Sequence, residues 1–183
     1  MNFTILNLLL FKLGWVAAVF SAAYGSAWIG AVTIVGIAAI NLIKAQQPGR
    51  ELWLLIAAAV VGLVWESVLT AQGVLVYAET PNAPIAPYWI VAMWILFATT
   101  LNVSMRWMKR SPWLALAFGG IGGPLSFLAG EKVGAVVFPQ PVLAIVVISI
   151  GWAVLVPAML RIADYFNGHS ATPLTPAVTG GQA

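Results

Sequence analysis

Residues 119–132 read Gly-Gly-Ile-Gly-Gly-Pro-Leu-Ser-Phe-Leu-Ala-Gly-Glu-Lys, and they lie inside an apolar run long enough to cross a bilayer. Where an ordinary spanning helix carries Leu and Val, this run has the helix-breaking or packing residues Gly119, Gly120, Gly122, Gly123 and Pro124. In lipid, a broken backbone survives only where neighbouring helices or a wet cavity satisfy its polar groups. We therefore expect a helix break here, in a segment that other helices cover on several sides and whose glycines permit close packing.

The composition is that of a membrane protein. Hydrophobic residues make up 62% of the chain and charged residues 7%, whereas soluble domains carry about 25% charged residues. The sequence has no cysteine, and its single histidine, His169, lies beyond the last apolar run. Disulfides, thiolate metal sites and histidine-based metal centres within the membrane are therefore excluded, and we expect no metal and no cofactor.

Apolar runs separated by turn-rich segments predict an all-α integral membrane protein with six transmembrane helices. The expected spans cover residues 4–22, 27–43, 52–77, 88–108, 113–137 and 142–166. Residues 1–166 then form one transmembrane domain. The small, polar, Pro- and Gly-rich residues 167–183 are expected to form a disordered tail.

Basic residues indicate the orientation of these spans. They flank the loops after the second and fourth spans and the end of the sixth, as Lys44, Arg50, Arg106, Lys109, Arg110 and Arg161. The positive-inside rule then places both termini in the cytoplasm, and the net charge of +3 reflects these loops and not a nucleic-acid footprint. A few residues recur at a similar spacing in the two halves of the chain, such as Trp65 and Trp152, and they predict a weak inverted 3+3 repeat.

Glu66 is the most informative single residue. It lies about 15 residues into the third span, or about 22 Å along a helix, and a charge at that depth costs at least ~2.5 kcal/mol. Gly62 and Thr70 share its helical face, so we expect Glu66 to point into the bundle and to be largely neutral. Two interpretations stand: a proton- or cation-binding site, and a structural carboxyl hydrogen-bonded to a neighbour.

Further polar side chains are candidates for a cavity open to the cytoplasm. Thr99, Asn102 and Arg106 follow one face of the fourth span at spacings of three and four. Lys12 enters the first span from the same side, and the sixth span adds Asp164 near its end. Alternatively, Lys12 extends its stem to reach water, and Arg106 and Asp164 are interfacial anchors.

Two further sets of residues have both a structural and a functional interpretation. Glu131 is either a solvated cap at the outer end of the fifth span or a second carboxyl that joins Glu66 in acid–base chemistry. Four tryptophans lie away from the expected membrane interfaces, where they serve either as packing or as a cage for an organic cation. These are Trp15, Trp65, Trp94 and Trp152.

Several segments together carry a family resemblance. They are Phe11-Lys-Leu-Gly-Trp15, Trp65-Glu66-Ser67, Pro87-Tyr-Trp89, Trp94-Ile-Leu-Phe-Ala-Thr-Thr-Leu101 and Gly122-Gly-Pro-Leu-Ser-Phe-Leu-Ala-Gly130. In this order, over nearly the whole chain up to the tail, they resemble the bacterial inner-membrane family known as domain of unknown function 2878. The resemblance implies six spans, an inner-membrane location and an acidic residue at Glu66, but no assigned activity. Lys12 departs from it, because a neutral polar residue is expected there.

The leading functional hypothesis is a small transporter or carrier for a lipid-like or cationic solute, with Glu66 as its coupling site. One alternative is a lipid-modifying membrane enzyme, or its accessory subunit, that uses Glu66 and Glu131. The other is a structural partner of another membrane protein. The expected partners are membrane lipids together with a small-molecule substrate, a second copy of the chain or another membrane protein.

Overall fold

The computed structural model describes residues 2–81 and 83–169. Within them the helices are α1 (Phe3–Ala23), α2 (Ala27–Lys44), α3 (Pro48–Ala71), α4 (Tyr88–Leu101), α5 (Pro112–Val133) and α6 (Pro141–Tyr165). A 3-10 helix, η1 (Arg106–Arg110), follows α4, and two short strands are β1 (Val76–Tyr77) and β2 (Val136–Val137). All of the described helices except α4 and η1 are long and apolar enough to cross a membrane. The prediction of an all-α integral membrane protein is therefore confirmed, while residues 170–183 of the predicted tail lie outside the described residues.

Proline and glycine set the ends of several helices. Pro48, Pro112 and Pro141 each occupy the first turn of a helix, where the missing N–H costs no hydrogen bond. Gly73, with φ of +65°, turns the chain just after α3. The third helix consequently ends at Ala71, before the predicted end at residue 77, and the chain continues into β1, which pairs antiparallel with β2.

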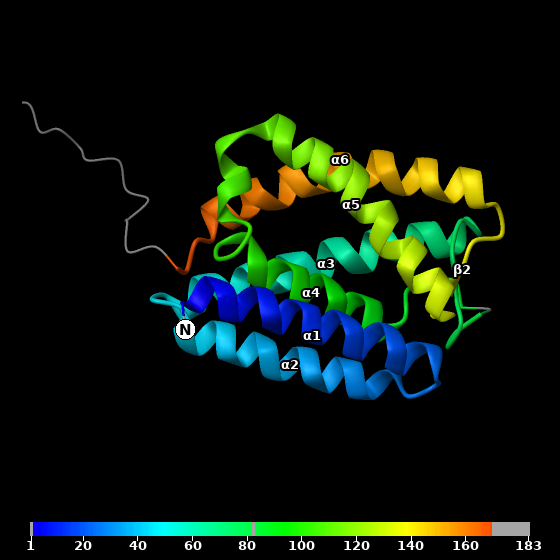
Figure 1. The fold of residues 1–183 in the computed structure, drawn as a ribbon, viewed down its shortest axis with the longest axis horizontal. Coiled ribbons are helices and arrows are strands. Elements are labelled where there is room, and N and C mark those ends of the chain that lie inside the picture. Colours follow the sequence, from blue (N-terminus) through cyan, green and yellow to red (C-terminus); the bar gives the residue numbers. More distant parts are fainter. Residues whose placement is uncertain (1, 82, 170–183) are drawn as a thin grey trace, which may run out of the picture.

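The α1–α2 hairpin lies on one side of the bundle and the α5–α6 hairpin on the other, with α3 and α4 between them (Figure 1). Helix α4 is central, because it packs on α1, α2, α3 and α6 and ten of its 14 residues are buried. The start of α1 and the end of α6 lie at the same end of the bundle, where the Phe3 and His169 rings are 5.8 Å apart. This end is called the terminal end below.

The fifth helix differs from the prediction in two ways. The predicted break at residues 119–124 is absent: α5 continues through Pro124, which is buried. Nor is α5 central: Ile121 is 63% and Leu125 60% exposed. The small residues instead allow α5 to approach α6, since a Cβ at Gly119 would lie only 2.1 Å from the carbonyl oxygen of Trp152.

The fourth span is also shorter than predicted. Helix α4 has 14 residues, about 21 Å, whereas the hydrocarbon core is about 30 Å thick. Near its end the hydroxyls of Thr99 and Thr100 donate to the carbonyls of Leu96 and Phe97, at 2.7 and 2.6 Å. Such bonds compete with the regular helix ladder, and the chain turns after Leu101 into η1. Thr99, Asn102 and Arg106 therefore do not share one helical face.

The main helix contacts do not follow the expected inverted repeat. In the first half the strongest contact joins α1 and α2, and in the second half it joins α5 and α6. An inverted 3+3 repeat would make α4 and α5 the counterpart of α1 and α2, but α5 packs mainly on α6. The repeat stays a prediction from sequence that the packing does not support.

Candidate functional site

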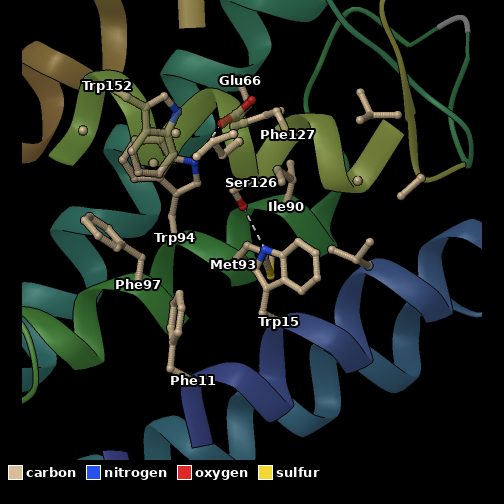
Figure 2. Close-up of a pocket in the computed structure, with 18 of the residues that line it drawn as sticks. Phe11, Trp15, Glu66, Ile90, Met93, Trp94, Phe97, Ser126, Phe127 and Trp152 are labelled. Carbon is tan, nitrogen blue, oxygen red and sulfur yellow. Dashed lines mark hydrogen bonds between the residues drawn. The ribbon is translucent and has the colours of Figure 1, made fainter. Parts of the chain in front are cut away.

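A cavity of about 510 Å³ lies between α1, α4, α5 and α6. Its walls are rich in aromatic side chains, which are Phe11, Trp15, Tyr77, Trp89, Trp94, Phe97, Phe118, Phe127 and Trp152. Figure 2 shows side chains of α1, α4, α5 and α6 converging on this space, with the Glu66 carboxyl beside Trp94 and Trp152. The volume and the apolar lining with few polar groups are typical of small-molecule sites.

Glu66 supplies the carboxyl on the cavity wall. Its side chain is fully buried, Oε2 accepts a hydrogen bond from the Tyr77 hydroxyl at 2.7 Å, and Oε1 accepts one from Trp94 Nε1 at 3.0 Å. Burial, followed by the nearby Glu66 carboxyl, raises the pKa of the Tyr77 phenol well above its ordinary value of 10, so Tyr77 is a donor here. Each carboxyl oxygen retains a second acceptor position. Glu66 therefore retains unused acceptor positions beside the cavity, and a ligand reaches them once the side chains that cover the carboxyl move.

Two stacked indoles form the wall beside this carboxyl. The rings of Trp94 and Trp152 lie 4.9 Å apart at an interplanar angle of 27°. Glycines make room for both rings: a Cβ at Gly62 would lie 2.2 Å from Trp94 Cγ, and one at Gly123 would lie 2.5 Å from Trp152 Cγ. The small face of α3 predicted around Glu66 thus packs against α4 and fixes the ring that holds the carboxyl.

The cavity reaches the outer surface between α1 and α5. Two of its lining residues, Val16 of α1 and Leu125 of α5, are 47% and 60% exposed. Each lies about 20 Å from the first residue of its helix, so this opening is level with the hydrocarbon region of a membrane and not with water. Trp15 Nε1 donates to Ser126 Oγ at 2.9 Å across the same gap, and Lys12 is exposed at the cavity rim.

The structure brings only part of the predicted site together. Glu66 and Lys12 line the aromatic cavity, whereas Thr99, Asn102, Arg106, Glu131 and Trp65 do not. These residues therefore do not form one polar cavity with Lys12. Arg106 lies with Asp164 in a separate recess at the terminal end, and the other four lie elsewhere.

Three of these residues, Thr99, Trp65 and Glu131, make structural contacts. The Thr99 carbonyl accepts hydrogen bonds from Nδ2 of Asn7 and of Asn41, at 3.0 and 3.1 Å. Trp65 packs so closely on α6 that a Cβ at Gly151 would lie 2.2 Å from its ring. Glu131 Oε1 accepts from the Phe138 backbone N–H at 3.4 Å, outside the cavity. Glu66 and Glu131 consequently do not form the pair of carboxyls that acid–base chemistry would need.

A second buried polar cluster lies at the terminal end and contains Asn102. The Glu51 carboxyl is fully buried there, and its Oε2 accepts from Asn102 Nδ2 at 3.0 Å and from the Gly168 backbone N–H at 3.3 Å. Lys109 Nζ donates to Asn102 Oδ1 at 2.7 Å, and His169 Nε2 lies 3.7 Å from Glu51 Oε1. Gly168 and His169, which the sequence assigned to the disordered tail, thus pack on the start of α3.

Sequence reasoning missed Glu51, Tyr77 and Ser126. Glu51 stands in the first turn of α3, where a carboxylate usually complements the helix dipole, so its pattern gave no sign of burial. Tyr77 and Ser126 reach the site through a strand pairing and through the approach of α1 to α5. Asn7 and Asn41 carried a usable signal, because amides inside spans normally face other helices.

The fold and the cavity define a class: a multi-pass membrane protein with an internal, ligand-sized aromatic chamber. The chain matches the family described as "Protein of unknown function (DUF2878)" over residues 4–158. It belongs to that family. Neither a curated protein nor a solved structure matches the chain significantly.

Proposed function

We propose that the protein is a small carrier that binds a lipid-like organic cation in the aromatic cavity, with Glu66 as the counter-ion. The observation that carries this proposal is a fully buried carboxyl on the wall of an aromatic cavity that opens at the depth of the hydrocarbon. A bacterial inner membrane is the proposed location. Within that membrane we place the terminal end on the cytoplasmic side, because basic residues cluster there and the positive-inside rule applies.

The chemistry of the cavity selects the ligand. Aromatic faces attract a cation by about 2 kcal/mol or more when the cation is desolvated. Nine aromatic side chains line the cavity, and the Trp94–Trp152 stack lies beside Glu66. Apart from Lys12 and Ser126, the rest of the lining is apolar and accommodates a hydrocarbon chain. A ligand with one cationic head and one apolar chain therefore matches both parts of the cavity.

Coupling to protons follows from the same carboxyl. A cation that binds Glu66 competes with the proton that otherwise neutralises it, because a buried carboxylate with no cation beside it is costly even when it accepts hydrogen bonds. Binding of the ligand releases the proton from Glu66, and release of the ligand lets Glu66 take up a proton again. Affinity for the cation should accordingly rise with pH.

Quenching of tryptophan fluorescence by a brominated alkyl-trimethylammonium tests the proposal, because bromine in the cavity lies close to Trp94 and Trp152. The protein in lipid nanodiscs should show saturable quenching that Glu66→Gln removes. Glu131→Gln is the matched control, since it makes the same change outside the cavity.

A brominated alcohol of the same chain length separates the role of the head from that of the chain. It should quench weakly, and equally in the parent and in Glu66→Gln. Equal affinity of the parent and Glu66→Gln for the ammonium probe would overturn the proposal, provided that both variants keep the same helix content.

A further inference from the structure

A second recess, of about 630 Å³, lies at the terminal end between η1 and the end of α6. It is lined by Arg106, Trp107, Lys109, Arg110, Asp164 and Asn167. We propose that this recess, called the basic recess here, binds the phosphate group of an anionic membrane lipid. The site is separate from the aromatic cavity and does not depend on its function.

The charges of the basic recess favour an anion. Three basic side chains and one carboxylate give it a net formal charge of +2. Lys109 Nζ is already engaged, at 2.7 Å from Asp164 Oδ1 and 2.7 Å from Asn102 Oδ1. That ion pair also neutralises the carboxylate that would otherwise repel a phosphate.

Arg106 and Arg110 remain available. Among the described residues, neither has a carboxylate within ion-pair distance, and both are exposed at the recess. Planar guanidinium groups bind phosphate oxygens in a bidentate manner. Both guanidinium groups line the same recess, so they can hold one phosphate between them.

The surroundings favour a lipid as the carrier of that phosphate. Trp107 is half exposed in the same recess, and its ring packs edge-on against Phe118 of α5 at 6.4 Å. An indole in this position is typical of the headgroup level of a membrane. Basic pockets between transmembrane helices on the cytoplasmic side recognise anionic headgroups, and the terminal end is the proposed cytoplasmic side.

Native mass spectrometry of the purified protein with added lipid tests the proposal. Phosphatidylglycerol should be retained in preference to phosphatidylcholine. Arg106→Gln/Arg110→Gln should weaken phosphatidylglycerol binding about thirtyfold, since each basic side chain near an anionic surface contributes about a factor of five. The matched control Arg50→Gln/Arg161→Gln removes the same charge from the same end of the bundle, outside the recess, and should leave binding unchanged.

Competition with inorganic phosphate identifies the source of the phosphate. Millimolar inorganic phosphate should fail to displace phosphatidylglycerol if the lipid is the ligand, and equal displacement by free phosphate would overturn that assignment. Equal losses in the two double variants would reduce the effect to general charge attraction and refute the site. Thermal melting of each variant without lipid checks that both double variants are folded.

Discussion

Replacing Gly119 by alanine should separate α5 from α6 and destabilise the bundle. A Cβ at Gly119 would lie 2.1 Å from the Trp152 carbonyl oxygen, whereas an ordinary contact begins at 3.4 Å. The obstacle is backbone, which cannot rotate away as a side chain can. The two helices must therefore move apart by about 1.3 Å, the difference between these distances, and interdigitated contacts along their interface are lost.

Gly122→Ala is the matched control for this change. On the same helix its Cβ would meet only the Phe118 ring, at 3.7 Å, which is an ordinary contact. Both substitutions gain about 0.5–1 kcal/mol of helix propensity, so that term cancels in the comparison. Overpacking typically costs 1–3 kcal/mol, and we expect Gly119→Ala to be less stable than Gly122→Ala by about that amount.

Unfolding by dodecyl sulfate in mild detergent micelles, followed by circular dichroism, measures this difference. Gly119→Ala should unfold at a lower sulfate fraction than the parent, and Gly122→Ala at an equal or higher fraction. If the two variants unfolded together, the close approach of α5 to α6 would be refuted. The glycine-rich stretch would then need another explanation.

Three further predictions concern the terminal end and the orientation. Cysteines placed at Gln46 and Ile85 of this cysteine-free chain should be labelled from the cytoplasmic and the opposite side, respectively; labelling of both from one side would refute the topology. Glu51→Ala should expose the Gly168 amide to hydrogen exchange and cost about 1–3 kcal/mol, because the groups that Glu51 accepts from lose their partner; unchanged exchange at Gly168 would contradict this role. Burial lowers the pKa of the His169 imidazole below 6.5, so the undocked segment binds protons more readily, and docking should be complete at neutral pH and weaken as the pH falls below about 6.5. A higher protection factor at Gly168 in acid, after correction for the slower intrinsic exchange there, would instead mean that the protonated imidazole pairs with Glu51.

Much of the fold is readable from the sequence because lipid imposes simple rules. Long apolar runs must be helices that satisfy their own backbone groups, and turn residues such as Pro112 and Pro141 mark where they begin. Glu66 could be identified for a related reason: a carboxyl at that depth has to face the inside of the bundle. These features depend on local sequence and on the solvent, and both are known in advance.

The remaining features depend on contacts that local sequence does not contain. Gly119 and Pro124 have the composition of a break, yet α6 packs closely enough for the helix to continue through them. Glu51 is buried because Gly168, 117 positions away, docks on it. The polar residues of the fourth span separate because the helix ends at Leu101. The local hydroxyl bonds of Thr99 and Thr100 compete with the helix there, and amides from two other helices bind the Thr99 carbonyl.

The most direct test of the central claim is infrared difference spectroscopy of the protein in lipid, with and without the alkyl-trimethylammonium probe. If Glu66 is the counter-ion, binding should convert a protonated carboxyl band into a carboxylate band, and Glu66→Gln should abolish that pair of bands. Saturable binding of the probe with no change in any carboxyl band would contradict the account, because the cation would then be held without Glu66.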